Sequence, residues 1–424
     1  MAATIFKAFT IPEIRKKLMV TFGLLAIYSL GSRIPAPGIN EQAAKSLQQN
    51  LSGNNILGFL NLFSGGGLSR VALFALGIMP YITASIILQL LTVVVPSLEK
   101  LQKEGEVGTA KITQYTRYLT VGLAFAQSIG YVFLFKSLSS AAGQQIITHF
   151  TLPRVFLIVV SLTAGTILLM WIGELITQRG IGNGISLLIF ASIVQRLPNG
   201  VQAWATNSDQ VFKVMMPFLA LAVIASIVFV QEGQRRIPVQ YAKRVIGRRM
   251  SQGGQTYLPL RVNMAGVIPV IFAASIMAFP PTVGQLVNQP WARSISNFFN
   301  PQGWKYVAGE TIFIIVFTYF YTAVTFNPVD QADNLKKYGG FVPGVRPGRP
   351  TAEFLDRILA RLTFPGAIFL AAVAAFPTIL INQTSANFFF GGTSILIVIG
   401  VALDTMKQLE AQLMMRNYEG YLKR

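Results

Sequence analysis

The chain has 424 residues, of which 52% are hydrophobic and 12% charged, about half the charged share of ordinary globular proteins. This composition excludes a soluble enzyme built around one large core and is typical of a polytopic membrane protein. The absence of cysteine excludes disulfides, thiol chemistry and cysteine-ligated metals. A net charge of +19 fits an anionic lipid surface, an acidic partner or a partner rich in nucleic acid.

Long apolar stretches predict ten membrane-spanning helices along the chain. One of the clearest is uncharged from Val71 to Leu98, which is enough helix to cross a hydrocarbon core of about 30 Å. It follows a short apolar stretch and a glycine-rich break, NLFSGGGLSR, so we expect a movable segment folded beside a fixed wall. The predicted spans are Leu18–Ile34, Val71–Val95, Tyr118–Phe135, Val155–Gly173, Ile185–Leu197, Val211–Val230, Met264–Val287, Val307–Phe326, Leu362–Ile381 and Thr393–Leu409.

The basic residues are distributed unevenly between the two sides of the membrane. Ten spans place both termini on one side, and with that side inside, 26 of the 35 Lys and Arg residues are inside and 9 outside. This bias follows the positive-inside rule and predicts a multi-pass membrane protein with both termini in the cytoplasm.

Two inside loops, about residues 231–261 and 328–361, are longer than a simple connection requires. In the first, RIPVQYAKRV mixes basic with β-branched and aromatic residues before a Ser-Gln-Gly-Gly turn, which predicts a small hairpin. The second is rich in Gly and Pro and ends at Thr351 in a predicted helix start. Attraction to anionic lipids, worth about 1 kcal/mol per basic residue, explains their charge as simply as docking of a cytosolic partner such as a ribosome.

The residues that carry chemistry are scarce, and no metal or cofactor site is predicted. Neither a Ser–His pair, a paired-Asp arrangement nor an HExxH motif is present, and His149 is the single histidine. Ion-coupled transporters usually keep ionisable groups at the membrane midplane, where these spans have few. A membrane enzyme is therefore remote, and a secondary transporter for a small solute is less favoured than a passive channel.

Some uncharged residues within the spans have two readings. Ile82 and Ile86 are four positions apart and share one helix face, where packing is a commoner role than lining a pore. Gln127 and Asn263 are by default amides that hydrogen-bond between helices.

Several long stretches of the sequence resemble the SecY family, the central subunit of the bacterial protein-conducting channel. They are LFSGGGLSRVALFALGIMPYITASIILQLLTVV, KEGEVGTAKITQYTRY, ITQRGIGNGISLLIFA, RRIPVQYAKRV, NMAGVIPVIFA, FNPVDQADNLKKYGGFVPGVRPGRPT and FFFGGTSILIVIGVALD. The resemblance implies an all-α membrane protein of ten transmembrane helices in two pseudo-symmetric halves, 1–197 and 198–424, around a central pore. It implies a channel in the bacterial cytoplasmic membrane that translocates unfolded polypeptides across this membrane and releases transmembrane segments into it.

The resemblance also assigns roles to residues. The pore ring falls on Ile82, Ile86, Ile189, Ile271 and Ile397. The plug, about residues 56–70, includes Leu57, Phe59, Leu60, Leu62, Phe63, Gly65 and Gly66, and the lateral gate includes Thr83, Gln127 and Asn263. A narrow apolar ring excludes ions and binds no particular side chain, so this assignment favours the pore reading of Ile82 and Ile86.

The two basic loops match the docking loops of the family. The implied docking residues are Arg235, Arg236, Lys243, Arg244, Arg248, Arg249, Lys336, Lys337 and Arg346. The implied partners are the small subunits SecE and SecG, the SecA ATPase, and the ribosome with its nascent chain or signal peptide. Anionic lipids are expected as well, and no nucleic-acid specificity beyond ribosomal RNA. The energy source would lie in these partners.

Overall fold

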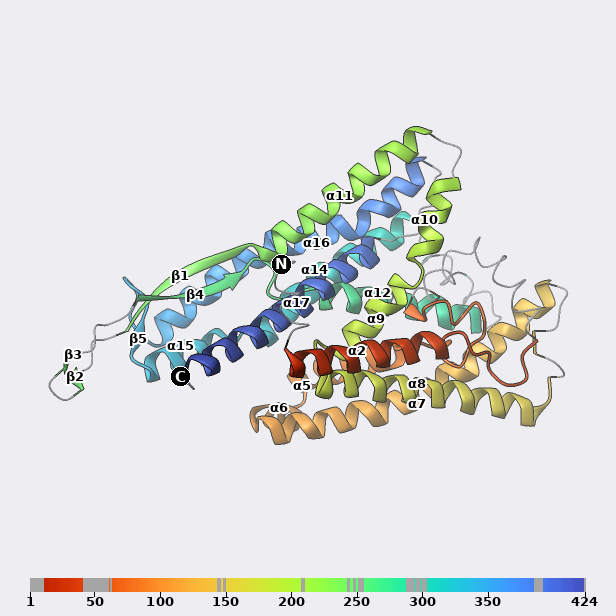
Figure 1. Ribbon diagram of the computed structural model, residues 1–424, viewed down its shortest axis with the longest axis horizontal. Helices are drawn as coiled ribbons and strands as arrows, with labels where there is room; N and C mark the ends of the chain where they lie inside the picture. The colour runs from red at the N-terminus through yellow and green to blue at the C-terminus, as the bar shows by residue number, and fades with distance from the viewer. Residues whose placement is uncertain are drawn as a thin grey trace. The chain divides into compact units, whose positions relative to one another are not determined.

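The computed structural model describes residues 11–40, 61, 63–142, 146–147, 150–206, 210–241, 245–246, 249–250, 255–286, 294, 298, 303–384 and 392–422. These residues form long helices and a few short strands (Figure 1). They group into two compact units, the first comprising 1–208, 274–307 and 401–424 and the second comprising 209–273 and 308–400. The predicted halves, 1–197 and 198–424, stay a prediction.

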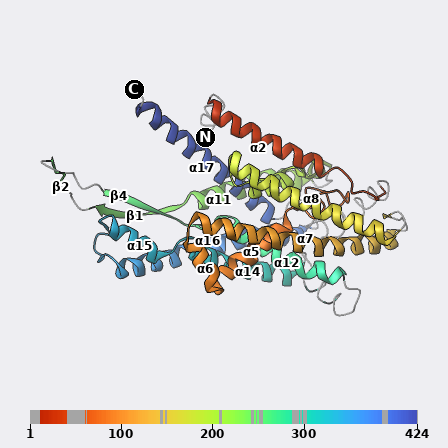
Figure 2. The same cartoon turned by 90° about the horizontal axis from the view of Figure 1, so that it is seen from below.

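The first unit contains most of the N-terminal helices. They are α2 (Pro12–Gly31), α5 (Met79–Val94), α6 (Pro96–Lys103), α7 (Glu106–Ala142), α8 (Leu152–Arg179), α9 (Gly184–Val194) and α10 (Leu197–Thr206). Helix α7 packs along both α5 and α8, and α2 packs on α8 and α9. Figures 1 and 2 both show α7 and α8 side by side over much of their length.

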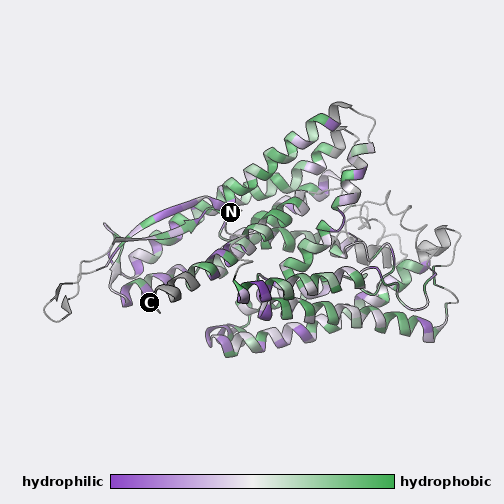
Figure 3. Ribbon diagram, in the orientation of Figure 1, coloured by the Kyte–Doolittle hydropathy of each residue, from purple (hydrophilic) through white to green (hydrophobic). Residues whose placement is uncertain are grey.

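The second unit contains α11 (Gln210–Glu232), α15 (Pro328–Lys337) and α16 (Arg349–Thr384). Three further helices, α12 (Ile268–Leu286), α14 (Trp304–Thr325) and α17 (Gly392–Leu422), belong partly to each unit. Large apolar side chains on α11 are exposed, Phe218 and Phe229 among them, and Figure 3 shows hydrophobic residues along most of this helix. Such an outer surface suits contact with lipid rather than with water.

Six helices in the described part of the chain are long and apolar enough to cross a membrane, or seven if α5 and α6 form one bent span. Two shorter apolar helices, at Gly184–Val194 and Ile268–Met277, coincide with the fifth and seventh predicted spans. The chain is therefore a mostly helical, multi-pass membrane protein. The count of ten spans stays a prediction.

The predicted helix from Val71 is wrong in its first turns. Residues 71–78 form turns, and α5 begins at Met79. Gly77 has a φ of +59°, in the left-handed region that interrupts a right-handed helix, and Pro80 lies in the first turn of α5. At the other end, α6 bends 99° away from α5. Lys103 donates a hydrogen bond to Glu99 on this short helix, which lowers the pKa of the Glu99 carboxyl.

The hairpin predicted in the first inside loop is confirmed. Strand β1 (Gln234–Tyr241) pairs antiparallel with β4 (Gln255–Arg261), with Ile237 opposite Leu258, and β2 (Val245–Ile246) pairs with β3 (Arg249–Met250). Strand β5 (Gly340–Phe341), from the second loop, pairs with the far end of β1 and completes a sheet of order β4-β1-β5. The two inside loops are thus one structure.

Candidate functional site

The described part of the glycine-rich segment after residue 60 is a compact loop held by its own hydrogen bonds. The Asn61 side chain accepts a hydrogen bond from the backbone N–H of Ser69 at 3.2 Å, and its carbonyl accepts one from Gly66 at 3.0 Å. The Ser64 hydroxyl accepts from the N–H of Leu68 at 3.0 Å. Asn61, Ser64 and Ser69 are buried, so these polar groups are satisfied inside the protein.

Close backbone packing fixes this loop on the helices of the first unit. A Cβ atom built on Gly77 would lie 2.7 Å from the carbonyl oxygen of Phe63, so only glycine allows the approach. Glycine is similarly required at Gly31 of α2, which faces the ring of Phe74, and at Gly165 of α8, which faces the backbone of Leu73. Leu73 and Phe74 therefore lie directly against these two helices.

The residues that follow α2 are hydrogen-bonded to the residues that precede α5. Ala36 donates to the carbonyl of Val71 and Leu73 donates to the carbonyl of Ile34, each at 2.9 Å. Val71 is completely buried with a φ of +47°, a conformation that is a genuine outlier for a β-branched residue. Strain of this kind persists only where the surrounding packing imposes it, and it clusters at functional sites.

Of the predicted plug residues, three are described. Phe63 is buried, whereas Gly65 and Gly66 are partly buried and have φ values of +62° and +86°. Leu57, Phe59, Leu60 and Leu62 lie outside the described residues.

The five predicted ring isoleucines are all buried, with at most 5% of each side chain exposed. Ile82 and Ile86 lie on one face of α5 and Ile189 lies on α9, all in the first unit. Ile271 on α12 and Ile397 on α17 belong to the second unit. A common ring of all five stays a prediction.

The predicted gate residues are placed on three elements. The Thr83 hydroxyl donates to the carbonyl of Met79 within α5, and Gln127 is half-buried on α7. Asn263 is buried in the second unit, where its amide nitrogen donates to Gly266 at 2.8 Å. Its Oδ1 atom is buried and accepts no hydrogen bond from the described residues.

A charged contact beside α5 was not predicted from the sequence. Arg117 on α7 makes two parallel hydrogen bonds of 2.8 Å to the carboxylate of Glu174 on α8, and a third of 2.8 Å to Gln114. Bidentate pairs of this geometry are strong and orient both helices.

The sequence reasoning also missed Glu310. It is 4% exposed on α14, and in the described part of the chain it is the only charged side chain buried to this degree. Its sequence context, YVAGETIFII, held the signal, because a carboxyl group inside an apolar helix is costly and is a functional-site hypothesis by default.

The described docking residues lie on strand β1, at the end of α15 and in the loop that follows β5. Arg235 and Arg236 are exposed on β1, and Lys336 and Lys337 are exposed at the end of α15. Arg346 is exposed in a tight loop between Gly344 and Gly348, both with positive φ, and its carbonyl accepts a hydrogen bond from Thr351. Lys243, Arg244 and Arg248 lie outside the described residues, and only the backbone of Arg249 is described.

A buried cluster joins the two docking loops to the membrane helices of the second unit. Leu260 and Leu355 are completely buried within it. The cluster consists of Ile237, Leu260, Phe326, Val342, Leu355, Ile358 and Leu359, drawn from both loops, from α16 and from the residue that follows α14. The exposed basic residues are therefore carried on a packed support rather than on free loops.

A protein-family model described as SecY matches residues 72–406 of the chain. This chain belongs to the SecY family. The protein translocase subunit SecY of Streptomyces coelicolor is 48% identical over 439 residues, which covers 100% of both chains. The chain is accordingly a protein-conducting channel subunit of the translocase and not an enzyme.

Solved structures agree with this assignment at the level of the fold. One described as "The structure of a protein conducting channel" has a TM-score of 0.63 at 19% identity and covers 96% of each chain. Another, Sec61 in the canine ribosome–channel complex from the endoplasmic reticulum, has a TM-score of 0.59 at 18% identity, also with 96% of each chain covered. The helices described above therefore adopt the fold of this channel family.

Proposed function

We propose that this chain conducts unfolded polypeptides through a constriction formed by Ile82, Ile86, Ile189, Ile271 and Ile397. The observation that carries the proposal is that all five positions are isoleucine and all five side chains are covered by protein instead of facing lipid. A narrow apolar constriction tends to exclude water and ions, whereas an extended chain of any sequence can slide through it.

The segment 56–70 closes this constriction from outside as the plug. Support comes from its described part, in which the loop around Phe63 is held by internal hydrogen bonds and pressed against Gly77, immediately before α5. Opening requires the loop to leave this packing, so the closed state is favoured until a polypeptide enters.

The lateral gate is closed by an amide pair between Gln127 and Asn263, beside Thr83. Support comes from the chemistry of the two side chains, because amides on neighbouring helices hydrogen-bond to one another inside a membrane. A signal sequence or transmembrane segment, itself an apolar helix, displaces this weak contact of about 0.6–2 kcal/mol by burying itself in the seam.

The exposed basic residues of the joined loops receive the cytosolic partners. The canine Sec61 relative was solved in a ribosome–channel complex, and Arg235, Arg236 and Arg346 offer the cationic surface that a ribosome or the SecA motor would contact. In this proposal SecE and SecG complete the complex, anionic lipids surround it, and both termini lie in the cytoplasm of a bacterium.

Ion leakage tests the constriction. The five ring isoleucines are replaced together by serine, and potassium efflux is measured from vesicles containing the purified protein with its small subunits. We expect the ring variant to leak potassium even when the channel is closed. The control variant, in which the exposed, lipid-facing residues Ile27, Ile312 and Ile368 are replaced by serine, should not leak. Equal, low efflux from both variants would refute the constriction.

A further inference from the structure

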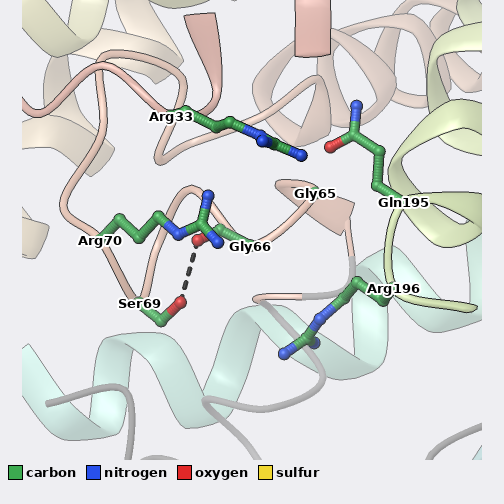
Figure 4. A pocket seen from close by; sticks show the side chains of 7 residues that line it. All are labelled: Arg33, Gly65, Gly66, Ser69, Arg70, Gln195 and Arg196. Carbon is green, nitrogen blue, oxygen red and sulfur yellow. Dashed lines mark hydrogen bonds between the residues drawn. The ribbon is translucent and has the colours of Figure 1, made fainter. Parts of the chain in front are cut away.

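A small pocket in the first unit is lined in part by the proposed plug segment, and the channel mechanism described above gives the pocket itself no role. It has a volume of about 40 Å³, room for roughly three water molecules and hence for one phosphate or carboxylate group. Its lining includes three arginines from segments that are far apart in the sequence. Arg33 follows α2, Arg70 ends the glycine-rich loop, and Arg196 lies between α9 and α10 (Figure 4).

The charge of the pocket is wholly positive among its described lining residues. None of these residues is acidic, and neither Arg33 nor Arg70 forms an ion pair with a described carboxylate. The positive charge of Arg70 repels that of Arg196, which is itself partly buried. Like charges lining one small pocket repel one another, and an anion bound there would offset the repulsion.

The arginines, rather than the remaining lining, favour an oxygen-rich anion. The hydroxyl of Ser69 donates to the carbonyl of Gly66 at 2.9 Å, which fixes the loop at the pocket wall. Figure 4 shows Arg33 pointing toward the side-chain amide of Gln195, whose Oε1 also accepts from Ser32 at 3.4 Å. Arginine forks match the oxygens of phosphate and carboxylate in two-pronged hydrogen bonds.

The location gives such an anion a mechanical effect. The pocket wall is made by the loop of residues 65–70 on one side and by the ends of α2 and α9 on the other. An anion bound to all three arginines would cross-link the loop to these helices. By the predicted topology all three arginines lie on the outer side of the membrane, where basic residues are few.

We propose that Arg33, Arg70 and Arg196 form an outer-side site for a phosphate group, which stabilises the seated position of the glycine-rich loop. The phosphate belongs either to free inorganic phosphate or to the headgroup of an anionic phospholipid. This inference concerns a ligand site and holds whether or not the five isoleucines form the constriction.

Phosphate binding to the full chain, purified with its small subunits in dodecyl maltoside, tests the proposal. Binding of inorganic phosphate is followed by the ³¹P line width. The ionic strength is kept constant by adding phosphate in place of chloride. We expect saturable binding that raises the unfolding temperature. Each of Arg70→Gln and Arg196→Gln should weaken it by about tenfold to a hundredfold, the range expected for losing a hydrogen bond to a charged group.

The controls separate the site from general positive charge. Arg154→Gln removes another arginine predicted on the outer side that does not line the pocket, and it should leave binding unchanged. Arg70→Lys keeps the charge and loses the fork, so it should bind with intermediate affinity and guards against a variant that merely fails to fold.

Two short-chain lipids identify the source of the phosphate. Displacement of inorganic phosphate by dioctanoyl phosphatidylglycerol, and not by dioctanoyl phosphatidylcholine, assigns the site to an anionic lipid. No displacement by either assigns it to free phosphate. The proposal is overturned if neither phosphate nor phosphatidylglycerol binds saturably, or if Arg70→Gln and Arg154→Gln bind alike.

Discussion

Replacing Gly77 by alanine should unseat the glycine-rich loop. The new Cβ would lie 2.7 Å from the Phe63 carbonyl oxygen and 3.1 Å from the Cα of Ser64, where ordinary contacts begin at 3.4 Å. Because both neighbours are backbone atoms, no side-chain rotation relieves the overlap, and the loop must retreat by about 0.7 Å. The φ of +59° adds the cost of a left-handed conformation for a residue with a Cβ.

The two costs have separate controls. Overpacking costs about 1–3 kcal/mol and the left-handed conformation about 1–2 kcal/mol, so Gly77→Ala should lose about 2–5 kcal/mol of stability. Gly66→Ala has a similar φ, +86°, with no atom near its Cβ, and should lose only the conformational part. Gly122→Ala, in open space on α7, should lose nothing.

Thermal unfolding and ion efflux from vesicles report on these three variants. If the glycine-rich loop is part of the plug, Gly77→Ala leaks potassium in the closed state, and Gly66→Ala leaks far less. The reasoning is refuted if Gly77→Ala melts with the wild-type protein, or if the two loop variants leak equally.

Three further variants test the support around the site. Arg117→Lys loses the fork to Glu174 and should cost about 1–3 kcal/mol, measured as a lower unfolding temperature; an unchanged melt would show that the pair is not structural. Leu355→Ala truncates a completely buried side chain of the cluster under the docking loops and should cost about 2–5 kcal/mol, whereas the exposed Val329→Ala should cost almost nothing; equal losses would contradict the packing argument. Arg346→Glu should impair SecA-driven translocation in an ATP-dependent secretion assay while membrane insertion of the chain stays normal, and full secretion would exclude the docking role.

The sequence predicted the parts of the fold that depend on local pattern. Hydropathy located the six helices that are long and apolar enough to cross a membrane, and the turn after RIPVQYAKRV located the β1–β4 hairpin, because both signals lie within a few neighbouring residues. The pairing of Gln240 with Phe341 was not predictable, since it joins residues 101 positions apart with no periodic signal.

The site was only partly readable for a related reason. Glycines at 31, 77 and 165 give no warning in sequence that each faces a backbone or ring, so the packing of the loop, and with it the late start of α5, needed the structure. Arg117 and Glu174 are 57 positions apart, and each alone resembles an ordinary residue at a membrane boundary. Glu310 was readable as a carboxyl group inside a predicted span, and the sequence prediction did not use it.

Cross-linking to an arrested polypeptide tests the central claim most directly. The chain has no cysteine, so single cysteines can be placed one at a time at the five ring positions and, as a control, at the lipid-facing Phe218. A secretory precursor halted midway, carrying one cysteine in the translocating stretch, should form disulfides with each of the five positions and not with position 218. Cross-links at position 218 as strong as those at the isoleucines, or none at the isoleucines, would contradict a pore at this constriction.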